Sequence, residues 1–298
     1  MKKMLFVVYP YAGKRRANRY IADIIGIFNR ADYEVITYMT SGPGDAAVIT
    51  QRYAAQVDLV VCAGGDGTLN ETISGVKHGG ADIPIGYIPC GSTNDFATSL
   101  KLSSNILQAA RDIVEGEPSL LDVGLFGERY FSYVASFGAF TKASYSAPQN
   151  VKNALGHMAY ILEGLKDPFQ IKPEHIRIEM EDRIIEGDYL FGAISNSTSL
   201  AGILTLDPRQ VDMADGKFEL LLIRAPRDAV ELADCINAVQ SKRYNCAMID
   251  FLSTSGLTVY ADPKMPWTLD GEKEDGHSAV QVRNLHHAIK LMRRLPHA

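Results

Sequence analysis

The residues best suited to bind a phosphate form a glycine-rich stretch with one acid at its centre. This stretch directly follows the apolar residues 59–63 and reads Gly64-Gly65-Asp66-Gly67-Thr68-Leu69-Asn70-Glu71. Glycines let the backbone come close to a phosphate, and the helix expected from Asn70 offers free N–H groups at its start. Asp66 would repel a phosphate unless a divalent cation bridged the two. The pattern therefore predicts a site for a phosphate and a metal ion, with an ordinary tight turn as the alternative.

Part of this stretch also suits a purely structural role. Thr68 and Glu71 stand three residues apart, which is the register of a capping box at the start of a helix. Asp66 has no place in that structural pattern. The chain contains no Gly-x-x-x-x-Gly-Lys-Ser/Thr sequence, so the predicted site is not of the Walker type.

A second polar loop follows the next expected strand, at residues 83–88. It offers hydroxyl and amide groups from Ser92, Thr93 and Asn94, followed by the carboxylate of Asp95. The alternative is a polar loop that only caps a helix. Two such loops at neighbouring strand ends predict one shared binding edge, because the carboxyl ends of parallel strands lie together.

The two loops together resemble one family. Gly-Gly-Asp-Gly-Thr is shared by diacylglycerol kinase-like lipid kinases, NAD kinases and, with Ser for Thr, phosphofructokinases. Residues 88–97, Ile-Pro-Cys-Gly-Ser-Thr-Asn-Asp-Phe-Ala, resemble the Pro-x-Gly-(Thr/Ser)-x-Asn-Asp-Phe-Ala signature of the bacterial diacylglycerol kinase and lipid kinase family. The resemblance extends over nearly the whole chain. It implies an enzyme that uses ATP and Mg²⁺ to phosphorylate the free hydroxyl of diacylglycerol or a related lipid.

The resemblance also assigns nucleotide contacts elsewhere. Residues 9–13 are similar to the family's first phosphate loop and read Tyr9-Pro10-Tyr11-Ala12-Gly13. Tyr9 stands where the family usually has Asn, which leaves backbone contacts as the ones expected at this position. Thr40 matches a threonine that touches the nucleotide. The full set implied for ATP is residues 9–13, Thr40, residues 64–71, Thr93, Asn94 and Asp95, with Asp66 and Asp95 organising Mg²⁺ and nucleotide.

Two later motifs complete the resemblance. Asp270-Gly271-Glu272 matches the family's Asp-Gly-Glu, which implies that Glu272 is the general base and Asp66 the second catalytic residue. An ordinary hairpin turn is the alternative for Asp-Gly. Residues 211–217 resemble a structural Mg²⁺ site of the bacterial branch, with Asp212, Asp215 and the carbonyl of Lys217 as ligands. A solvated acidic turn is the alternative there.

Two other functions stay open on the sequence. An NAD kinase would share Gly-Gly-Asp-Gly-Thr, although residues 92–97 do not favour it. A non-catalytic relative that binds lipid or nucleotide is the second alternative, and Tyr9 is its only support, because Asp66, Asp95 and Glu272 are all present.

The spacing of apolar residues predicts two domains. Residues 1–124 alternate short apolar strands (4–8, 34–38, 59–63, 83–88) with helices from about residues 20, 45 and 70. This order indicates a doubly wound α/β domain with a parallel sheet, similar to NAD kinases and phosphofructokinases. Residues 125–285 hold short alternating segments typical of a mostly antiparallel β-sandwich, interrupted by helices at 154–165 and 228–241. Residues 286–298 are expected to form a helix that packs back on the first domain.

Composition limits the remaining possibilities. The formal charge of −5 argues against a nucleic-acid partner. Four scattered cysteines indicate reduced thiols rather than a disulfide framework. No segment is long and apolar enough to span a membrane, so we expect a cytoplasmic protein in transient peripheral contact with the inner face of the membrane, where a lipid substrate lies. The oligomeric state, including a homodimer, stays open.

Two segments have features that suit a lipid surface. Lys290, Arg293 and Arg294 lie beside Leu291 and Leu295, which is compatible with an anionic lipid but also with a solvated helix face. Residues 152–161 are similar to a family helix near the lipid side, with an amphipathic core helix as the equal alternative.

Overall fold

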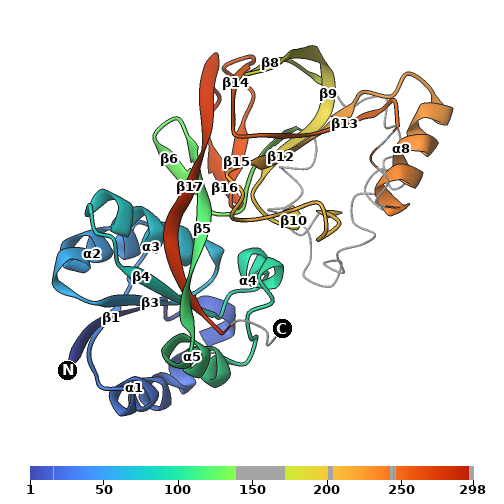
Figure 1. Ribbon diagram of the computed structural model, residues 1–298. Coiled ribbons are helices and arrows are strands. Elements are labelled where there is room, and N and C mark those ends of the chain that lie inside the picture. The colour runs from blue at the N-terminus through green and yellow to red at the C-terminus, as the bar shows by residue number, and fades with distance from the viewer. Residues whose placement is uncertain (16, 139–171, 201–203, 242–243, 245, 295–298) are drawn as a thin grey trace. The chain divides into compact units, whose positions relative to one another are not determined.

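The computed structural model describes residues 1–15, 17–138, 172–200, 204–241, 244 and 246–294. The chain divides into two compact units (Figure 1). The first unit contains residues 1–123 and 287–298, and the second contains residues 124–286. The domain boundaries expected from the sequence, after residues 124 and 285, each lie one residue from these limits. The expected helix at 154–165, with the lipid-side segment 152–161, falls outside the described residues.

The first unit is a parallel sheet in the strand order β17-β4-β3-β1-β2. Its elements in chain order are β1 (Lys2–Val8), α1 (Ile21–Arg30), β2 (Tyr33–Met39), α2 (Asp45–Tyr53), β3 (Leu59–Gly64), α3 (Asp66–His78), β4 (Pro84–Pro89), α4 (Asp95–Ser99) and α5 (Ile106–Glu115). Short 3-10 turns occupy Ala12–Arg15, Ala17–Arg19 and Ala54–Gln56. A helix connects each strand from β1 to β4 to the next, as the sequence predicts.

Helices cover both faces of this sheet. One face packs against α1 and α5, where the rings of Phe6 and Phe28 meet edge to face at 5.6 Å. The other face lies under α2 and α3 (Figure 1). α3 approaches α2 closely at Gly75, where an added Cβ would lie 2.5 Å from the carbonyl oxygen of Ala47. Strands covered on both faces are apolar throughout, which explains the continuous apolar run of β3.

The predicted C-terminal helix is wrong. Residues 279–293 form a single strand, β17 (Ala279–Arg293), which lies parallel to β4 with Lys290 opposite Pro84 and Leu291 opposite Ile85. Its buried side chains near this end, Ile289 and Leu291, are two residues apart, the period of a strand. The open edge of β4 needs hydrogen-bond partners for its backbone, and only an extended segment can supply them.

The second unit consists mainly of antiparallel strands. The described order is β16-β15-β7-β9-β8-β14-β17, and β9 also pairs with β12, which pairs with β13. The bounds are β5 (Glu117–Phe126, shared with the first unit), β6 (Arg129–Phe131), β7 (Val134–Gly138), β8 (Glu174–Met180), β9 (Ile184–Ser195), β12 (Phe218–Arg224), β13 (Ile249–Thr254), β14 (Gly256–Tyr260), β15 (Trp267–Leu269) and β16 (Glu272–Glu274). The described part of this unit also contains a short pair, β10 (Ser199–Leu200) and β11 (Leu204–Thr205), and the helix α8 (Ala229–Ser241).

The core of the second unit is built around one tryptophan. The ring of Trp267 meets Phe126 at 4.8 Å and Phe137 at 5.0 Å, both edge to face. All three side chains are buried. Aromatic pairs of this kind stabilise a core beyond the area that they bury. A parallel first unit and an antiparallel second unit confirm the predicted fold class.

Candidate functional site

Four loops meet at the carboxyl edge of the first unit's sheet, at residues 9–13, 40, 64–68 and 90–95; we call this the four-loop edge. Backbone hydrogen bonds join the loops to one another. The N–H of Tyr9 donates to the carbonyl of Ala63 at 2.9 Å, and the N–H of Thr40 donates to that of Val8 at 2.9 Å. The N–H groups of Cys90 and Gly91 both donate to the carbonyl of Gly64. The loops singled out in the sequence therefore form one connected surface.

Two glycines permit this close approach. An added Cβ on Gly91 would lie 2.5 Å from the Cα of Gly65, closer than real side chains come. Gly13 has a φ of +50°, and an added Cβ there would clash with the carbonyl oxygen of Cys90. Only glycine lets the three loops pack backbone against backbone at these two points. Their position in the sequence motifs thus has a structural cause.

The helix α3 starts earlier than the sequence predicts, at Asp66 rather than Asn70. Gly65 is its N-cap and has no side chain to cap the helix, so the predicted capping box, with Thr68 at the cap and Glu71 three residues on, is wrong. A helix start without a side-chain cap leaves backbone N–H groups for an anion, and the helix dipole favours negative charge there. The first turn of this 13-residue helix is the feature of the four-loop edge best suited to a phosphate.

Asp66 has a structural role that the sequence did not reveal. Its carboxylate accepts hydrogen bonds from the backbone N–H groups of Asp95 at 3.0 Å and Phe96 at 3.3 Å. It therefore caps α4 from 29 positions away and joins the two predicted phosphate loops. Asp66 is 8% exposed and Asp95 is 5% exposed. Two buried acids, one of whose carboxylates contacts the backbone of the other, suit a divalent cation.

Glu71 caps a different helix from the one predicted. Its carboxylate accepts from the N–H groups of Gly44 at 2.7 Å and Ala46 at 3.1 Å, at the start of α2. The helix dipole also favours a negative charge at this position. Glu71 thus supports the loop that carries Thr40, and these contacts give its side chain a positioning role.

Asn94 holds the second phosphate loop in shape. It has a φ of +55°, its Oδ1 accepts from the N–H of Gly91 at 2.9 Å, and its Nδ2 donates to the carbonyl of Gly91 at 3.0 Å. The hydroxyl of Tyr87 donates to the same Oδ1 at 3.3 Å. Burial, followed by the nearby charge of Asp66, holds the pKa of the Tyr87 phenol well above its ordinary value. Tyr87 therefore stays protonated and keeps this bond.

The remaining predicted residues of the four-loop edge differ in accessibility. Thr93 is exposed, as are the rings of Tyr9 and Tyr11, which meet edge to face at 6.0 Å. Thr40 is buried, and its hydroxyl lies 3.4 Å from the carbonyl of Val8. The same loops also contain Pro10, Gly64, Gly65, Gly67 and Thr68. The side chains of three further predicted residues are buried: Ala12, Leu69 and Asn70. Leu69 in particular belongs to the core.

In the second unit, Asp270 and Gly271 form a two-residue hairpin turn between β15 and β16. Their φ values are +49° and +84°, and Leu269 pairs with Glu272 across the turn. The Asp270 carboxylate accepts from the N–H groups of Ser132, Tyr133 and Val134 and from the Ser132 hydroxyl. Burial raises its pKa to about 6, against the opposing effect of these hydrogen bonds. Asp270 therefore has a structural role, because it joins the hairpin turn to residues 132–134.

Glu272 directly follows this turn and remains accessible. Its side chain is 48% exposed and forms an ion pair with Arg129 at 2.6 Å. The same guanidinium pairs with Glu274 at 2.7 Å, whose side chain is only 19% exposed. Arg129 was not among the predicted site residues, because nothing in the local sequence links it to a motif 143 positions away. It orients the predicted base.

Comparison with known proteins identifies the family of this chain. The family model described as the diacylglycerol kinase catalytic domain matches residues 3–126. A diacylglycerol kinase of Staphylococcus epidermidis is 34% identical over 275 residues, which make up 91% of this chain and 86% of that protein. This chain belongs to the diacylglycerol kinase family. The diacylglycerol kinase of Bacillus subtilis (strain 168) is 29% identical over 274 residues, which cover 91% of this chain and 90% of that protein.

A solved structure supports the fold of this diacylglycerol kinase family member. A structure from Bacillus anthracis described as a diacylglycerol kinase has a TM-score of 0.76 and 19% identity, and the match covers 98% of this chain and 97% of that one. A second structure from the same organism has a TM-score of 0.83 at 20% identity, with the same coverage of both chains. At this identity the likeness concerns the fold.

The acidic turn of this diacylglycerol kinase family member has a further carboxylate nearby. Asp212 and Asp215 each accept one backbone N–H, from Ala214 and Lys217, and the carbonyl of Lys217 accepts from the side chain of Asn284. Burial, then the charges of Asp215 and Asp212, raises the pKa of Glu219 to about 8. The Oε2 atom of Glu219 is buried without a hydrogen-bond partner among the described residues. Three carboxylates whose charges act on one another suit a hard cation.

Among the helices that the structure describes, none is long and apolar enough to cross a lipid bilayer.

Proposed function

We propose that this protein is an ATP- and Mg²⁺-dependent lipid kinase that phosphorylates the free hydroxyl of diacylglycerol or a related lipid. The observation that carries this proposal is the four-loop edge, where a helix start without a side-chain cap lies beside two buried carboxylates. Membership of the diacylglycerol kinase family supports the reaction class, and the named relatives support the lipid. In this proposal the enzyme meets its lipid at the inner surface of the membrane, as a peripheral cytoplasmic protein.

The residues of the first unit have assigned roles in this proposal. The backbone of residues 9–13 and 64–68 holds the phosphates of ATP, and Thr40 and Thr93 add side-chain contacts. Asp66 and Asp95 hold Mg²⁺, since hard cations prefer carboxylate oxygens and both residues are buried. Mg²⁺ supplies charge neutralisation at the transferred phosphoryl group. Asp66 also keeps α4 in place through the N–H groups that it accepts.

In the second unit we propose Glu272 as the group that takes the proton from the lipid hydroxyl. Arg129 orients its carboxylate, and the half-exposed side chain is open to a substrate. General acid–base help of this kind contributes roughly 10²–10⁴-fold to a rate. The separate acidic turn is proposed as a structural Mg²⁺ site held by Asp212, Asp215 and the Lys217 carbonyl. The unpartnered oxygen of Glu219 supports it, because a bound cation would satisfy that buried atom.

A lipid-panel assay tests the proposed function. The protein is incubated with γ-labelled ATP, Mg²⁺, mixed micelles of diacylglycerol and other hydroxylated lipids, and NAD, and the products are identified by mass spectrometry. A phosphorylated lipid as the product supports the proposal. NADP as the product would mean an NAD kinase, and no product from any acceptor would mean a non-catalytic relative.

A further inference from the structure

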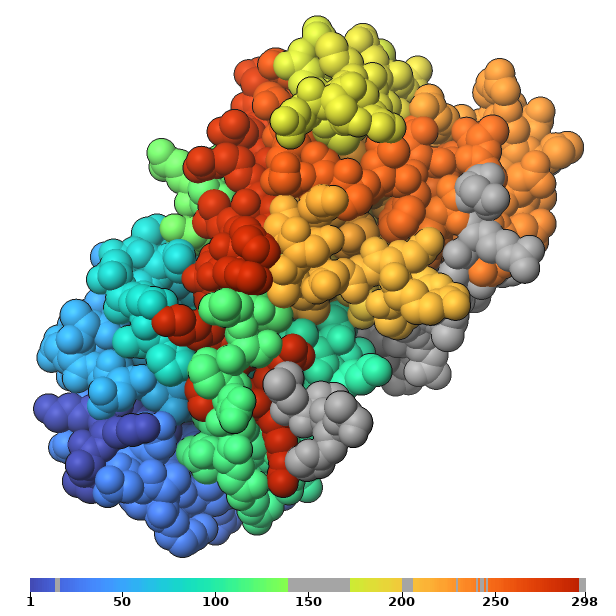
Figure 2. Space-filling model, viewed as in Figure 1, coloured from blue at the N-terminus to red at the C-terminus, as the bar shows by residue number. Residues whose placement is uncertain are grey.

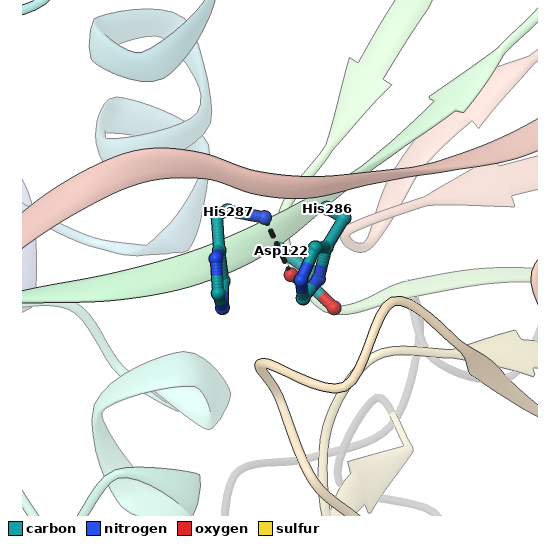
Figure 3. A group of neighbouring side chains, drawn as sticks. All are labelled: Asp122, His286 and His287. Carbon is teal, nitrogen blue, oxygen red and sulfur yellow. Dashed lines mark hydrogen bonds between the residues drawn. The ribbon is translucent and has the colours of Figure 1, made fainter.

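The first unit contains a cavity of about 340 Å³ that none of the roles above uses. It lies between the end of β4, the connection from α4 to α5, α5 itself and the end of β17. The end of β17, in red, reaches the surface of the first unit beside β5, in green, with which β17 pairs (Figure 2). The charged residues of the lining are Lys101, Asp112, Arg293 and Arg294. Three cations face one acid, so the lining carries net positive charge.

Arg293 is the residue that makes this cavity unusual. Its Nη2 donates to the hydroxyl of Ser119 at 2.9 Å, while its Nε is buried without a hydrogen-bond partner among the described residues. No carboxylate of the described chain forms an ion pair with its guanidinium. Desolvation lowers its pKa, and the cation remains charged at neutral pH. A partly buried cation with an unpaired N–H is costly until an anion binds it.

Two cations close to Arg293 in the sequence give a direct comparison. Lys290 forms an ion pair with Asp82 at 2.5 Å, and Arg294 forms one with Glu115 at 3.4 Å. The acid of the cavity, Asp112, accepts instead from the side-chain amide of Gln108 at 2.8 Å. Arg293 is thus the cation at this end of β17 for which the described residues supply no anionic partner.

A second cation borders the cavity on a strained backbone. Lys101 has a φ of +55°, a left-handed conformation that strains a non-glycine residue. The turn is held by the N–H of Lys101, which donates to Thr98, and by that of Leu102, which donates to Ala97. Lys101 forms no ion pair with the described residues. The turn therefore presents a second uncompensated cation on the border of the cavity that Arg293 lines.

The rest of the lining is apolar and decides the size of the ligand. Leu100, Leu102, Ile113 and Met292 contribute carbon surface. The volume exceeds what a single phosphate group fills, so the space also accepts a short carbon moiety. Guanidinium groups match the oxygens of phosphate in geometry and charge. We propose that this cavity binds the phosphate of a phosphomonoester, whether a soluble glycerol phosphate or the headgroup of an anionic phospholipid.

The site has a physical connection to the four-loop edge. Tyr87 lines the cavity, and its hydroxyl donates to Asn94, which shapes the second phosphate loop. Ser99 lines it as well, and its hydroxyl donates to the carbonyl of Asp95 at 3.0 Å. Occupation of the cavity is therefore expected to alter the mobility of residues 91–95. This gives the ligand the place of an effector, distinct from the loops that hold ATP in the proposed function.

The first test measures binding to soluble and membrane-bound phosphate separately. Calorimetric titration uses glycerol 3-phosphate, and co-sedimentation uses phosphatidylcholine vesicles with and without phosphatidic acid. Arg293→Gln is compared with the parent and with a matched control on the same strand, Lys290→Gln, whose side chain is not part of the cavity lining. We expect Arg293→Gln to weaken binding roughly 10- to 100-fold, the effect of a charge-assisted hydrogen bond. The control should change it by less than about threefold, the scale of an exposed ion pair.

The two arms identify the source of the phosphate. Glycerol 3-phosphate binding that depends on Arg293 supports a soluble ligand, and a dependence seen only with phosphatidic acid vesicles supports a lipid headgroup. Equal binding by the parent and Arg293→Gln in both arms overturns the proposal. This comparison cancels any phosphate held at the four-loop edge, because that edge is the same in both proteins.

A second measurement keeps the proposal testable if Arg293→Gln does not fold. The Nε resonance of Arg293 is followed by NMR in the parent protein during the same titrations, and Lys101→Gln serves as a variant at an exposed position. A shift of this resonance that is weakened in Lys101→Gln supports the site. A resonance that does not move at saturating probe overturns it.

Discussion

The four-loop edge of the first unit and the Asp270–Gly271 turn of the second use an aspartate in the same way but leave different groups exposed. Asp66 accepts N–H groups from the start of α4, and Asp270 accepts three from residues 132–134. In the first unit, the groups that remain available beside this aspartate are backbone N–H donors at the start of α3. In the second unit, the available group is the carboxylate of Glu272, held by Arg129. Aspartates with similar structural roles thus lie beside donors for an anion in one unit and beside a proton acceptor in the other.

The connections between strands differ in the same two regions. The loops of the four-loop edge follow parallel strands, whose carboxyl ends meet, so residues far apart in the chain converge there. The Asp270–Gly271 turn joins adjacent antiparallel strands, so it places Glu272 directly after itself in the hairpin. The four-loop edge brings several loops together through contacts such as that between Asp66 and α4, while the second unit presents Glu272 from one hairpin that residues 129–134 hold in place. Substitutions at Asp66, Glu272 and Asp270 test this difference, and one at Asp215 tests the separate acidic turn.

The largest expected effect is at Asp66. Asp66→Asn keeps an oxygen for the N–H groups of α4 but loses the charge that the proposed Mg²⁺ needs, so we expect turnover to fall at least about 10³-fold with the fold retained. Asp66→Ala loses both functions and should also lower the free energy of unfolding by about 1–3 kcal/mol. Lipid kinase activity and urea unfolding measure the two effects.

Thermal-shift titration with Mg-ATP gives the control for Asp66. If Asp66→Asn is stabilised by Mg-ATP as much as the parent, Asp66 is only a cap for α4, and the metal role proposed for it is wrong.

The next effect is expected at Glu272. Glu272→Gln keeps the size and a polar contact with Arg129, so it should lower kcat roughly 10²- to 10⁴-fold and leave ATP affinity unchanged. Glu274→Gln is the matched control, because it removes a carboxylate from the same strand and the same guanidinium. Steady-state kinetics at saturating lipid compare the two variants.

A Glu272→Gln variant with near-parental kcat would leave Glu272 as a hairpin residue. Asp95 would then be the next candidate for the proton acceptor. Equal losses in both variants would instead assign the effect to the orientation of Arg129.

Asp270→Asn should affect stability more than chemistry. An amide has one accepting oxygen, whereas both oxygens of the Asp270 carboxyl group accept hydrogen bonds, so we expect a loss of about 2–4 kcal/mol in the free energy of unfolding at pH 4. The raised pKa of Asp270, about 6 against 3.8, means that its stabilising contribution is present below pH 3.8 and is lost as the pH rises through 6. The gap between parent and variant should therefore narrow from pH 4 to pH 7.

Urea unfolding of both proteins at several pH values measures this gap. Other acids titrate equally in parent and variant and cancel in the difference. A gap that stays constant with pH would mean that Asp270 is charged throughout this range in the folded protein.

The smallest effect is expected at Asp215. Asp215→Asn should weaken Mg²⁺ binding to the acidic turn roughly 10- to 100-fold, lower activity indirectly and recover at high Mg²⁺. Asp262→Asn is the matched control, because Asp262 also accepts a backbone N–H two residues on, in an exposed turn of the same unit. A crystal grown with Mg²⁺ that shows only water between Asp212 and Asp215 would contradict the site.

Several features of this molecule could be predicted from the sequence because their signals are local. Continuous apolar runs indicated β1, β3 and β4, and the glycine stretches that follow them indicated loops at one edge. Asp270 and Gly271 indicated a two-residue turn, which the structure contains. The loop around Asn94, 28 residues after Asp66, completed the pattern that resembles the family.

The tertiary structure decided what depends on partners distant in the chain. β17 is a strand because β4 has an open edge, with which it pairs. The spacing of apolar residues in 286–294 carries no information about that edge. The cap that Asp66 provides for α4, the Arg129 partner of Glu272 and the Glu219 oxygen beside the acidic turn arise in the same way. A sequence shows which groups are able to donate, accept or carry charge. Which of them meet is determined by the folded backbone, because buried polar groups must find partners wherever the fold places them.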